Sequence, residues 1–580
     1  MTDRTCPRCL NPEIIVPISR KSTADFNTGS WTSVRPRFAQ KISPCRAACP
    51  AGNDIAGAAR AAARGDFDTA LAAFLEESPL PGVCGRVCYH PCQGACNLIG
   101  LDGALNIRAL ERAAADHGQA EVRALSDAGR DKPVVVVGSG PAGLACAYHL
   151  ARLGHAITLM EATDRAGGLL TRGIPGFRLP PAAVEKDLQR IWSLAVKLHT
   201  ESAVDEKNLA VMAREHAAVF LSPGAAAHLA LTVPGEELKG VVPGLAFLRS
   251  SRLQNQARGA RVVVIGGGNT ALDTARTALR SGAKRVRVLY RRTREQMPAF
   301  ADEVAEAGAE GVQIETLVAP IAFLGNAGRL EAVRLVQMRL DTPEADGRLR
   351  PVPHEGTEKE LVCDMAIIAA GQVPGPEPCM RELRWEHGRL WTDRWGATSH
   401  PGWFAGGDVT LSKASVVDAI ASGKRAALGI HLALTKNPAE DALQGITLGP
   451  GPAFSLAALF EPPRNWQPDK IATIDPHSLL FTPPCPPQTL SAAEPDERVR
   501  SGVEVAMGFS PSQAASEADR CLCCGTCVGC DRCLTYCPEG AVIAPARTGE
   551  KYTVRHEYCK GCSICASVCT RGVMEPGGDP

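Results

Sequence analysis

Between about residues 132 and 435 the chain alternates short apolar runs with longer segments that mix apolar and polar positions. Short apolar runs are typical of strands buried on both faces, and the longer mixed segments are typical of helices that pack on a sheet. This alternation predicts the α/β class, with doubly wound parallel sheets.

The flanking segments follow other patterns. Residues 45–128 contain Ala-rich stretches of helical character at 54–65 and 66–77. Residues 436–515 are irregular and rich in proline, which predicts a linker or an arm that wraps around other parts of the molecule. The last segment, 516–580, is dense in cysteine and has the length of a small separate module.

Composition and charge narrow the class of protein. The chain has 580 residues, 45% of them hydrophobic, and a net charge of +1. This length exceeds one hydrophobic core and suggests roughly three to five domains. A near-neutral charge gives no general attraction to nucleic acid or to an anionic membrane. The sequence starts with polar residues and has no apolar run long enough to span a bilayer, so we expect a cytoplasmic protein without a membrane span.

The 23 cysteines change the picture more, because of where they lie. Eight fall between residues 6 and 96, and eleven fall between residues 521 and 569. A disulfide scaffold would be a short secreted chain. Thiols at spacings of two and three residues in this long chain therefore indicate cluster ligation. The four scattered cysteines are interpreted as core or surface thiols: Cys146, Cys363, Cys379 and Cys485.

An apolar strand at 134–137 runs into a glycine-rich turn and then a helix. Gly138 permits the tight turn, Gly140 lets the backbone approach a pyrophosphate, and Gly143 allows the helix to pack closely on the strand. The next strand ends at Glu161, 23 residues after Gly138, where a carboxylate can bind a ribose diol. The combination predicts a dinucleotide site, and a glycine turn without a ligand is the weaker alternative.

A second strand and glycine-rich turn follow at 262–271, with alanine as the third member of the fingerprint. The position equivalent to Glu161 is Leu289, and three arginines follow it at 291, 292 and 294. A guanidinium group binds a 2′-phosphate bidentately, whereas a carboxylate would repel it, which indicates NADP(H) rather than NAD(H). A solvated basic loop is the alternative. The residues assigned to this second site are Gly266, Gly268, Asn269, Thr270, Arg291 and Arg292.

Two further segments indicate that the first site holds the flavin. Ala166-Gly167-Gly168 follows Glu161, and Phe404-Ala-Gly-Gly407-Asp408 comes much later, before another helical stretch. These segments complete the first domain if the chain inserts its nicotinamide domain and then returns. We expect Gly168, Gly407 and Asp408 at the first site, with Asp408 facing the ribityl or phosphate region of FAD.

The C-terminal cysteines have the spacing of a bacterial two-cluster ferredoxin, in which the fourth cysteine of each run ligates the other cluster. Paired zinc sites would use two Cys-x2-Cys pairs for each metal, and they would not explain the third cysteine at the same spacing in each run. A slipped register that uses Cys524, one of three cysteines just before the first run, stays open, although Pro538 favours the first assignment. That assignment gives two sets: Cys527, Cys530, Cys533 and Cys569, and Cys559, Cys562, Cys565 and Cys537.

From Cys45 to about residue 430 the chain resembles the glutamate synthase small-subunit family of iron–sulfur flavoproteins. The resemblance is carried by CRAACPAGND, PGVCGRVCYHPCQGAC, VVVVGSGPAGLACAYHL, GIPGFRLP, VVVIGGGNTALDTARTAL, YRRTREQMPA and FAGGDV. It implies FAD at the first site, a reduced nicotinamide at the second, and a contact from Arg178 to one of them. Where the family usually has Ala-Thr-Gly before the domain crossover, this chain has Ser-Pro-Gly at 222–224.

The resemblance also implies two [4Fe–4S] clusters in the helical region. Two cysteines that the family places near positions 37 and 40 are Arg37 and Gln40 here. One cluster would then be held by Cys49, Cys88, Cys92 and Cys84, with Glu111 as an outside candidate. The other would keep only Cys45 and Cys96. We hypothesise that Cys6 and Cys9 complete it, and a disordered or zinc-binding leader is the alternative.

These patterns together predict an FAD-dependent NAD(P)H:acceptor oxidoreductase that passes electrons between NADP(H) and [4Fe–4S] clusters. We expect an electron-transfer subunit of a larger complex, such as a 2-oxoacid:acceptor oxidoreductase, with ferredoxin or catalytic subunits as partners. A stand-alone ferredoxin–NADP reductase, a partner of dissimilatory sulfite reductase and an electron-inactive scaffold are the alternatives. The predicted domains are a leader (1–30), a helical iron–sulfur domain (31–130), an FAD domain (131–235 and 396–435), an NAD(P)H domain (236–395), a linker (436–515) and a ferredoxin domain (516–580).

Overall fold

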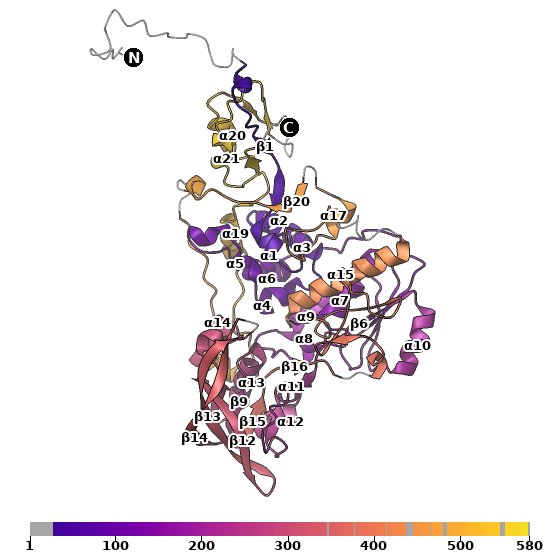
Figure 1. Cartoon of the computed structure of the whole chain (residues 1–580), viewed down its shortest axis with the longest axis vertical. Coiled ribbons are helices and arrows are strands. Elements are labelled where there is room, and N and C mark those ends of the chain that lie inside the picture. Colours follow the sequence, from indigo (N-terminus) through magenta and orange to yellow (C-terminus); the bar gives the residue numbers. More distant parts are fainter. Residues whose placement is uncertain are drawn as a thin grey trace, which may run out of the picture.

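The computed structural model of the chain describes residues 27–577, apart from 345–346, 376–377, 413, 437–444, 464–465, 480–483 and 546–551. The molecule is elongated (Figure 1). The cysteine-rich C-terminal module lies at one end of the long axis, and the α/β domain that carries the second glycine-rich turn lies at the other. The N-terminal helices lie between these ends, next to the first α/β domain.

The first α/β domain contains β3 (Val134–Val137), β4 (Ile157–Met160), β5 (Lys197–His199), β6 (Ala218–Leu221), β19 (Trp403–Ala405), α7 (Pro141–Arg152), α8 (Leu169–Arg172), α9 (Pro181–Trp192), α10 (Glu206–Glu215) and α15 (Val416–Thr435). Its strands form a parallel sheet in the order β19-β6-β3-β4-β5. The first three valines of β3 are buried because this strand lies at the centre of the sheet. Because β19 follows the second α/β domain in the sequence, the sheet is completed only by a segment that comes after that domain.

The second α/β domain contains β8 (Val241–Pro243), β9 (Arg261–Ile265), β10 (Arg285–Tyr290), β11 (Gln313–Thr316), β15 (Met365–Ile368), α11 (Gly244–Arg249), α12 (Ser251–Gln256), α13 (Asn269–Arg280), η4 (Arg294–Gln296) and α14 (Ala301–Ala309). Its parallel sheet has the order β11-β10-β9-β15-β8. An antiparallel meander is added to it, made of β12 (Val318–Asn326), β13 (Arg329–Pro343) and β14 (Leu349–Val362).

The chain passes between the two α/β domains along a short antiparallel pair, β7 (Ala227–His228) with β16 (Gln372–Val373). The return segment then forms η5 (Pro378–Met380), β17 (Trp385–Glu386) and β18 (Arg389–Leu390). One strand of the pair leads out of the first domain and the other leads back. The pair therefore forms the two-stranded link through which the second domain is inserted.

The N-terminal helices are α1 (Pro44–Ala48), α2 (Ile55–Ala62), α3 (Phe67–Leu75), α4 (Pro81–Val87), α5 (Pro91–Gly94), η3 (Asn97–Gly100) and α6 (Ile107–His117). Side chains of asparagine and aspartate cap α2, α3 and α6, which fixes where these Ala-rich helices begin. The helices join the first α/β domain through buried polar contacts. Lys424 Nζ of α15 lies 2.8 Å from the carbonyl oxygen of Ala51, and Tyr148 Oη of α7 lies 2.7 Å from that of Leu75.

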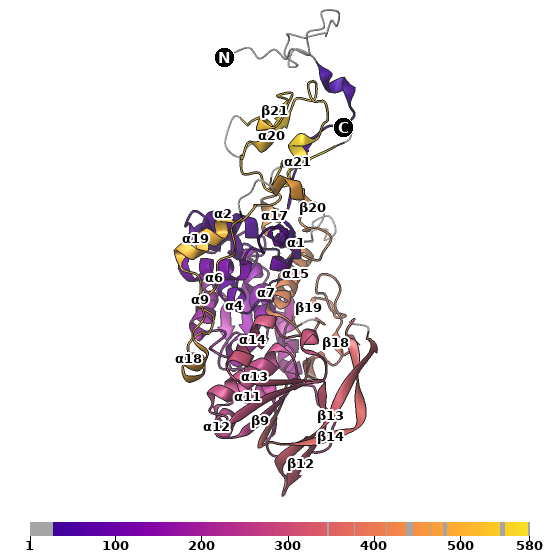
Figure 2. The ribbon, with the colours of Figure 1, turned by 90° about the vertical axis from the view of Figure 1, so that its left-hand side faces the viewer.

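The C-terminal part consists of α17 (Ala457–Phe460), β20 (Trp466–Ile471), η6 (Pro476–Leu479), α18 (Pro495–Arg500), α19 (Pro511–Asp519), α20 (Arg532–Thr535), β21 (Val542–Ile543), β22 (Thr553–Val554), α21 (Ile564–Ser567) and β23 (Met574–Glu575). It is joined by the first described segment, with η2 (Thr28–Trp31), β1 (Arg37–Phe38) and β2 (Gln40–Ile42). β1 pairs with β23, and β2 pairs with β20. Figure 2 shows α19 lying on the N-terminal helices and α18 farther along the same side.

This architecture confirms the predicted fold class: two Rossmann-like α/β domains, preceded by helices and followed by a small α+β module. Parts of the proline-rich segment pack against the rest of the molecule as an arm does: Ile446 and Leu448 are buried, and the backbone N–H of Val505 donates to the carbonyl oxygen of Phe177 at 2.9 Å. The domain boundaries stay predictions. Within the described ranges, no helix combines the length and the apolar character that crossing a membrane requires.

Candidate dinucleotide and cluster sites

The first glycine-rich turn needs each of its glycines for a physical reason. Gly138 has a φ of 96°, and a Cβ there would lie 2.3 Å from the carbonyl oxygen of Ser222. A Cβ on Gly143 would lie 1.9 Å from the carbonyl oxygen of Gly138, whereas one on Gly140 would meet nothing. The open space at Gly140 leaves the N-terminus of α7 accessible, and free N–H groups at such a terminus bind phosphate.

Two glycines from other segments close over this turn. Gly168 has a φ of 56°, and a Cβ on it would lie 3.0 Å from Cα of Gly140. A Cβ on Gly407 would lie 2.9 Å from Cβ of Ala142, in the first turn of α7. The structure thus brings Gly140, Gly168 and Gly407 together around the start of α7, although the last of them is far away in sequence.

Glu161 follows β4 and is 6% exposed. Its Oε1 accepts hydrogen bonds from the backbone and hydroxyl of Thr163, at 2.8 and 2.7 Å, and its Oε2 accepts from Ser139. These donors fix the carboxylate beside the glycine turn. A carboxylate offers about four acceptor positions, and these four donors occupy them. A ribose diol would therefore bind by replacing the hydroxyl donors of Ser139 and Thr163.

The second glycine-rich turn is equally tight. Gly266 has a φ of 145°, and a Cβ there would lie 2.2 Å from the carbonyl oxygen of Ala369. Around Gly268 only Pro298 comes within 4 Å of such an atom, so the N-terminus of α13 is open. Asn269 Oδ1 accepts a hydrogen bond of 3.1 Å from the backbone of Phe300. The side chain of Asn269 therefore holds the loop that precedes α14 in place.

A cavity of about 810 Å³ extends from this turn towards the first domain. Gly266, Gly268 and Thr270 line one side of it, and Asp408 lines another. Burial raises the pKa of Asp408 above its ordinary value. The cavity is large enough for a nicotinamide dinucleotide and reaches a residue predicted at the flavin site.

The two arginines expected at the 2′-phosphate differ in exposure and in whether they are already paired. Arg291 is exposed and lines the cavity. Arg292 also lines it but is 2% exposed, donates to the carbonyl oxygen of Leu349 at 2.9 Å, and forms a 2.6 Å ion pair with Glu344. Arg348 is a third basic residue of the cavity wall. It was missed in the sequence because it lies in the turn before β14, far from the glycine motif.

Arg178 takes a position that the sequence did not predict. Its side chain is 7% exposed, NH1 lies 2.7 and 2.8 Å from the carboxylate oxygens of Asp273, and Nε lies 2.8 Å from Glu303. Asp273 is on α13 and Glu303 is on α14, both in the second α/β domain. In this structure Arg178 therefore bridges the two α/β domains.

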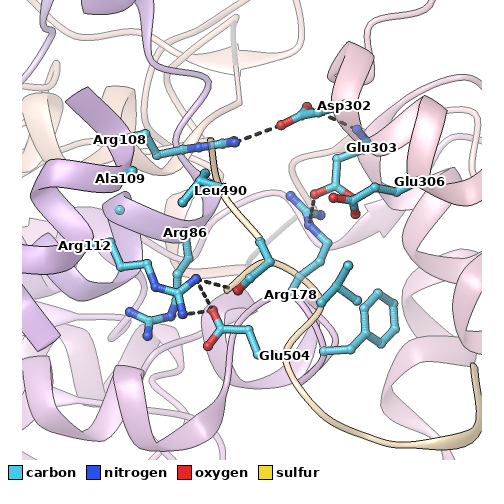
Figure 3. A pocket seen from close by; sticks show the side chains of 14 residues that line it. Arg86, Arg108, Ala109, Arg112, Arg178, Asp302, Glu303, Glu306, Leu490 and Glu504 are labelled. Carbon is cyan, nitrogen blue, oxygen red and sulfur yellow. Dashed lines mark hydrogen bonds and ion pairs between the residues drawn. The ribbon is translucent and has the colours of Figure 1, made fainter. Parts of the chain in front are cut away.

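Figure 3 shows that Arg178 belongs to a larger group of charges. From the N-terminal helices, Arg86 and Arg112 each lie 2.8 Å from Glu504 of the C-terminal arm, and Arg108 lies 2.8 Å from Asp302 of α14. We call these residues, together with Arg178, Asp273 and Glu303, the interdomain charge junction. It brings together the helices, the arm and both α/β domains.

The two ferredoxin sets predicted from spacing are brought together in space. Cys537, Cys559, Cys562 and Cys565 line one hollow of the C-terminal module. Cys533 has Cys527, Cys530 and Cys569 as neighbours, and burial together with these thiols raises its pKa to about 12. Iron binding would displace such protons, as metal binding to thiols does. The ligand roles of both sets stay predictions.

In the helical region, Cys49, Cys84, Cys88 and Cys92 line one hollow, together with Glu111. Burial raises the pKa of Glu111 to about 8, and its Oε1 accepts a hydrogen bond of 3.3 Å from Asn53. Cys45 and Cys96 lie outside this hollow. The hypothesised ligands Cys6 and Cys9 lie outside the described residues.

The spacing of the thiols bears on which metal fits. Across the ranges that the structure describes, no three His, Cys, Asp or Glu side chains converge as the ligands of a single metal ion do. A zinc ion with bonds of about 2.3 Å to sulfur needs such convergence. Thiols spread around hollows fit a larger, multi-iron cluster. The scattered Cys146 and Cys363 are buried, Cys379 is partly buried, and Cys485 is exposed.

Comparisons with known proteins agree with this arrangement. Residues 132–423 match the family described as pyridine nucleotide-disulphide oxidoreductase, and residues 38–122 match the family described as dihydropyrimidine dehydrogenase domain II, 4Fe-4S cluster. The chain is 35% identical over 521 residues to the NADP(+)-dependent formate dehydrogenase subunit beta of Moorella thermoacetica, covering 83% of this chain and 70% of that protein.

Two further relatives cover different shares of the chain. The NADPH-Fe(3+) oxidoreductase subunit beta of Geobacter sulfurreducens is 34% identical over 570 residues, covering 90% of this chain and 82% of that one. The glutamate synthase [NADPH] small chain of Azospirillum brasilense is 35% identical over 425 residues, covering 68% of this chain and 87% of that one. The chain therefore belongs to the pyridine nucleotide-disulphide oxidoreductase family, in its glutamate synthase small-chain-like branch, and is an NADP-dependent iron–sulfur flavoprotein oxidoreductase.

Proposed function

We propose that this chain is the NADPH-oxidising, electron-transfer subunit of a larger oxidoreductase. NADPH binds in the cavity of the second α/β domain, with its pyrophosphate at the N-terminus of α13 and its 2′-phosphate at Arg291. FAD binds at the first glycine turn, held by the N-terminus of α7, Glu161, Gly168 and Gly407. When bound, FAD accepts a hydride and releases its two electrons one at a time.

One observation carries this proposal. Asp408 and Ala414 line the large nicotinamide cavity, and Val417, at the start of α15, lines the hollow of Cys49, Cys84, Cys88 and Cys92. A single short stretch of the first α/β domain therefore borders both the place where hydride would arrive and the first place where single electrons would leave. The hydride transfer itself would need no protein acid, and the one proton left when both electrons have departed would be released to solvent.

The names of the relatives support an assignment as a subunit. Two of them are beta subunits, one of a formate dehydrogenase and one of an NADPH-Fe(3+) oxidoreductase. We expect the present chain to supply or receive electrons for a catalytic partner in the same way. A 2-oxoacid:acceptor oxidoreductase remains our example of such a partner. Isolation under mild anaerobic conditions tests this: co-elution of a catalytic subunit supports it, and a chain that elutes alone contradicts it.

The electron route is tested by anaerobic stopped-flow mixing of the reconstituted full chain with NADPH and with a soluble ferredoxin. We expect flavin reduction followed by ferredoxin reduction. In a Cys49→Ser variant, flavin reduction should keep its rate and ferredoxin reduction should slow by at least tenfold. Cys485→Ser, at an exposed thiol, is the matched control and should change neither rate. Ferredoxin reduction at an unchanged rate in Cys49→Ser would refute the route.

A further inference from the structure

Cys45 and Cys96, which the sequence left with two missing ligands, lie next to a third segment of the chain. The backbone N–H of Lys41, in β2, donates to the carbonyl oxygen of Gly525 at 3.0 Å. A Cβ on Gly525 would lie 2.3 Å from the carbonyl oxygen of Lys41, so the two backbones touch. This contact holds the residues just before Gly525 against the start of α1, where Cys45 lies.

A side-chain contact brings the same segment to Cys96. Asn97, which directly follows Cys96, has its Nδ2 3.4 Å from Sγ of Cys524. Cys45 and Cys524 are also electrostatic neighbours, and Cys96 acts on both of these thiols. Cys521 in turn has Cys45 as an electrostatic neighbour. Four thiols from three separate segments therefore lie together.

The backbone from Cys521 to Cys524 repeats the form of the ferredoxin loops. In Cys559-x2-Cys562 the third residue, Gly561, has a φ of 67° and its N–H lies 3.4 Å from Sγ of Cys559. In Cys521-x2-Cys524 the third residue, Cys523, has a φ of 49° and its N–H lies 3.4 Å from Sγ of Cys521. A non-glycine residue in this left-handed region is unfavourable, so the loop form is maintained against backbone strain.

We propose that Cys45, Cys96, Cys521 and Cys524 hold a [4Fe–4S] cluster between the N-terminal helices and the C-terminal module. Two of these ligands replace the pair absent at Arg37 and Gln40, whose backbones are instead committed to β1 and β2. Cys6 and Cys9 are then not needed. The four thiols release their protons to solvent when the cluster binds, and no change of oxidation state is required.

The position of this site deepens the proposed function, on which its electron-carrying role rests. Cys92 of the first hollow and Cys521 of the new site each have Cys45 as an electrostatic neighbour. Only Gly525 and Thr526 separate Cys524 from Cys527, the first ligand expected in the ferredoxin module. The new cluster therefore lies between the cluster next to the flavin domain and the two clusters of the module, and makes the route continuous.

The test is iron and acid-labile sulfide per chain in the anaerobically reconstituted full chain. The double variant Cys521→Ala/Cys524→Ala should lose about four iron atoms, the content of one [4Fe–4S] cluster. Cys45→Ala/Cys96→Ala should lose the same amount and the same signal in the electron paramagnetic resonance spectrum of the reduced protein. Cys523→Gly is the matched control: it keeps the loop, relieves the left-handed strain and should retain all iron.

Two results would overturn the proposal: full iron content in a folded Cys521→Ala/Cys524→Ala variant, or a loss of about four iron atoms in Cys6→Ser/Cys9→Ser instead. If the double variant does not fold, as judged by lost FAD, the single variant Cys524→Ser decides. It should alter the resonance signal of one cluster alone, and an unaltered spectrum refutes the site. Iron counting involves neither NADPH nor an acceptor, so this proposal and the proposed function fail in different experiments.

Discussion

Replacing Arg178 with methionine tests whether the interdomain charge junction holds the two α/β domains together. The arginine side chain is 7% exposed, and its partners Asp273 and Glu303 are 5% and 11% exposed. Methionine keeps most of the apolar stem but removes the cation from both carboxylates. Removing one partner of a buried ion pair costs roughly 3–5 kcal/mol. Because Arg276 also pairs with Glu303, we expect the lower end, about 3 kcal/mol.

The destabilisation should depend on pH with a defined sign. Burial raises the pKa of Asp273 to about 6, and Arg178 opposes that rise. Without Arg178 the pKa of Asp273 rises further, so above about pH 6 the folded variant keeps a proton that the unfolded chain releases. Stability then falls with rising pH, by up to about 1.4 kcal/mol per pH unit for one group. The deficit relative to the parent protein should therefore grow from pH 6 to pH 8.

The measurement is urea unfolding of the flavin-loaded chain at several pH values, followed by tryptophan fluorescence and by FAD release. Arg172→Met is the control, since Arg172 pairs with Asp164 at the surface and should change stability by less than about 1 kcal/mol. Adding Asp273→Asn to Arg178→Met should recover part of the loss and remove its pH dependence. An unchanged unfolding midpoint with loss of FAD would refute the bridging role and indicate a flavin contact instead.

Three further outcomes follow from the structure. Arg291→Ala should raise KM for NADPH about 10- to 100-fold, the loss of one charge-assisted contact, and leave KM for NADH unchanged; equal effects on both cofactors would contradict the assignment. Arg292→Ala should lower the unfolding midpoint more than it changes KM, because its guanidinium is already paired. His431 is hydrogen-bonded to His155 at 3.0 Å, and burial lowers its pKa to about 4. Because the unfolded chain binds this proton more readily, the free energy of unfolding should fall by up to roughly 3 kcal/mol as the pH drops from 6.5 to 4. In pH-jump unfolding, His431→Leu should flatten this dependence.

The parts of the site that sequence predicts best are those set by local spacing. A glycine that must reach φ > 0 or admit a neighbouring backbone leaves its mark within a few residues, as Gly138 and Gly143 do. The ferredoxin runs are likewise local, so spacing alone predicts their two sets of cysteines. The fold class, the cofactors and the family followed from such patterns.

What sequence could not supply depends on contacts between distant segments. Spacing allows Cys524 as a slipped ligand of the ferredoxin module, but its neighbours Cys45 and Cys96 are more than 400 residues away in the chain. Arg178 lies in a family motif, and nothing in that motif shows that Asp273 would bind its guanidinium. Arg292 follows its strand in the expected place, yet a distant carboxylate already pairs with it.

The pairing of β1 with β23 has a consequence for how the protein is made. Arg37 stands opposite Glu575, and Lys41 forms a 2.9 Å ion pair with the same glutamate. During synthesis β1 therefore stays without this partner until the whole stretch between residues 38 and 574 has been translated. A truncation that removes β23 would therefore take away the strand partner of β1 and the carboxylate that pairs with Lys41.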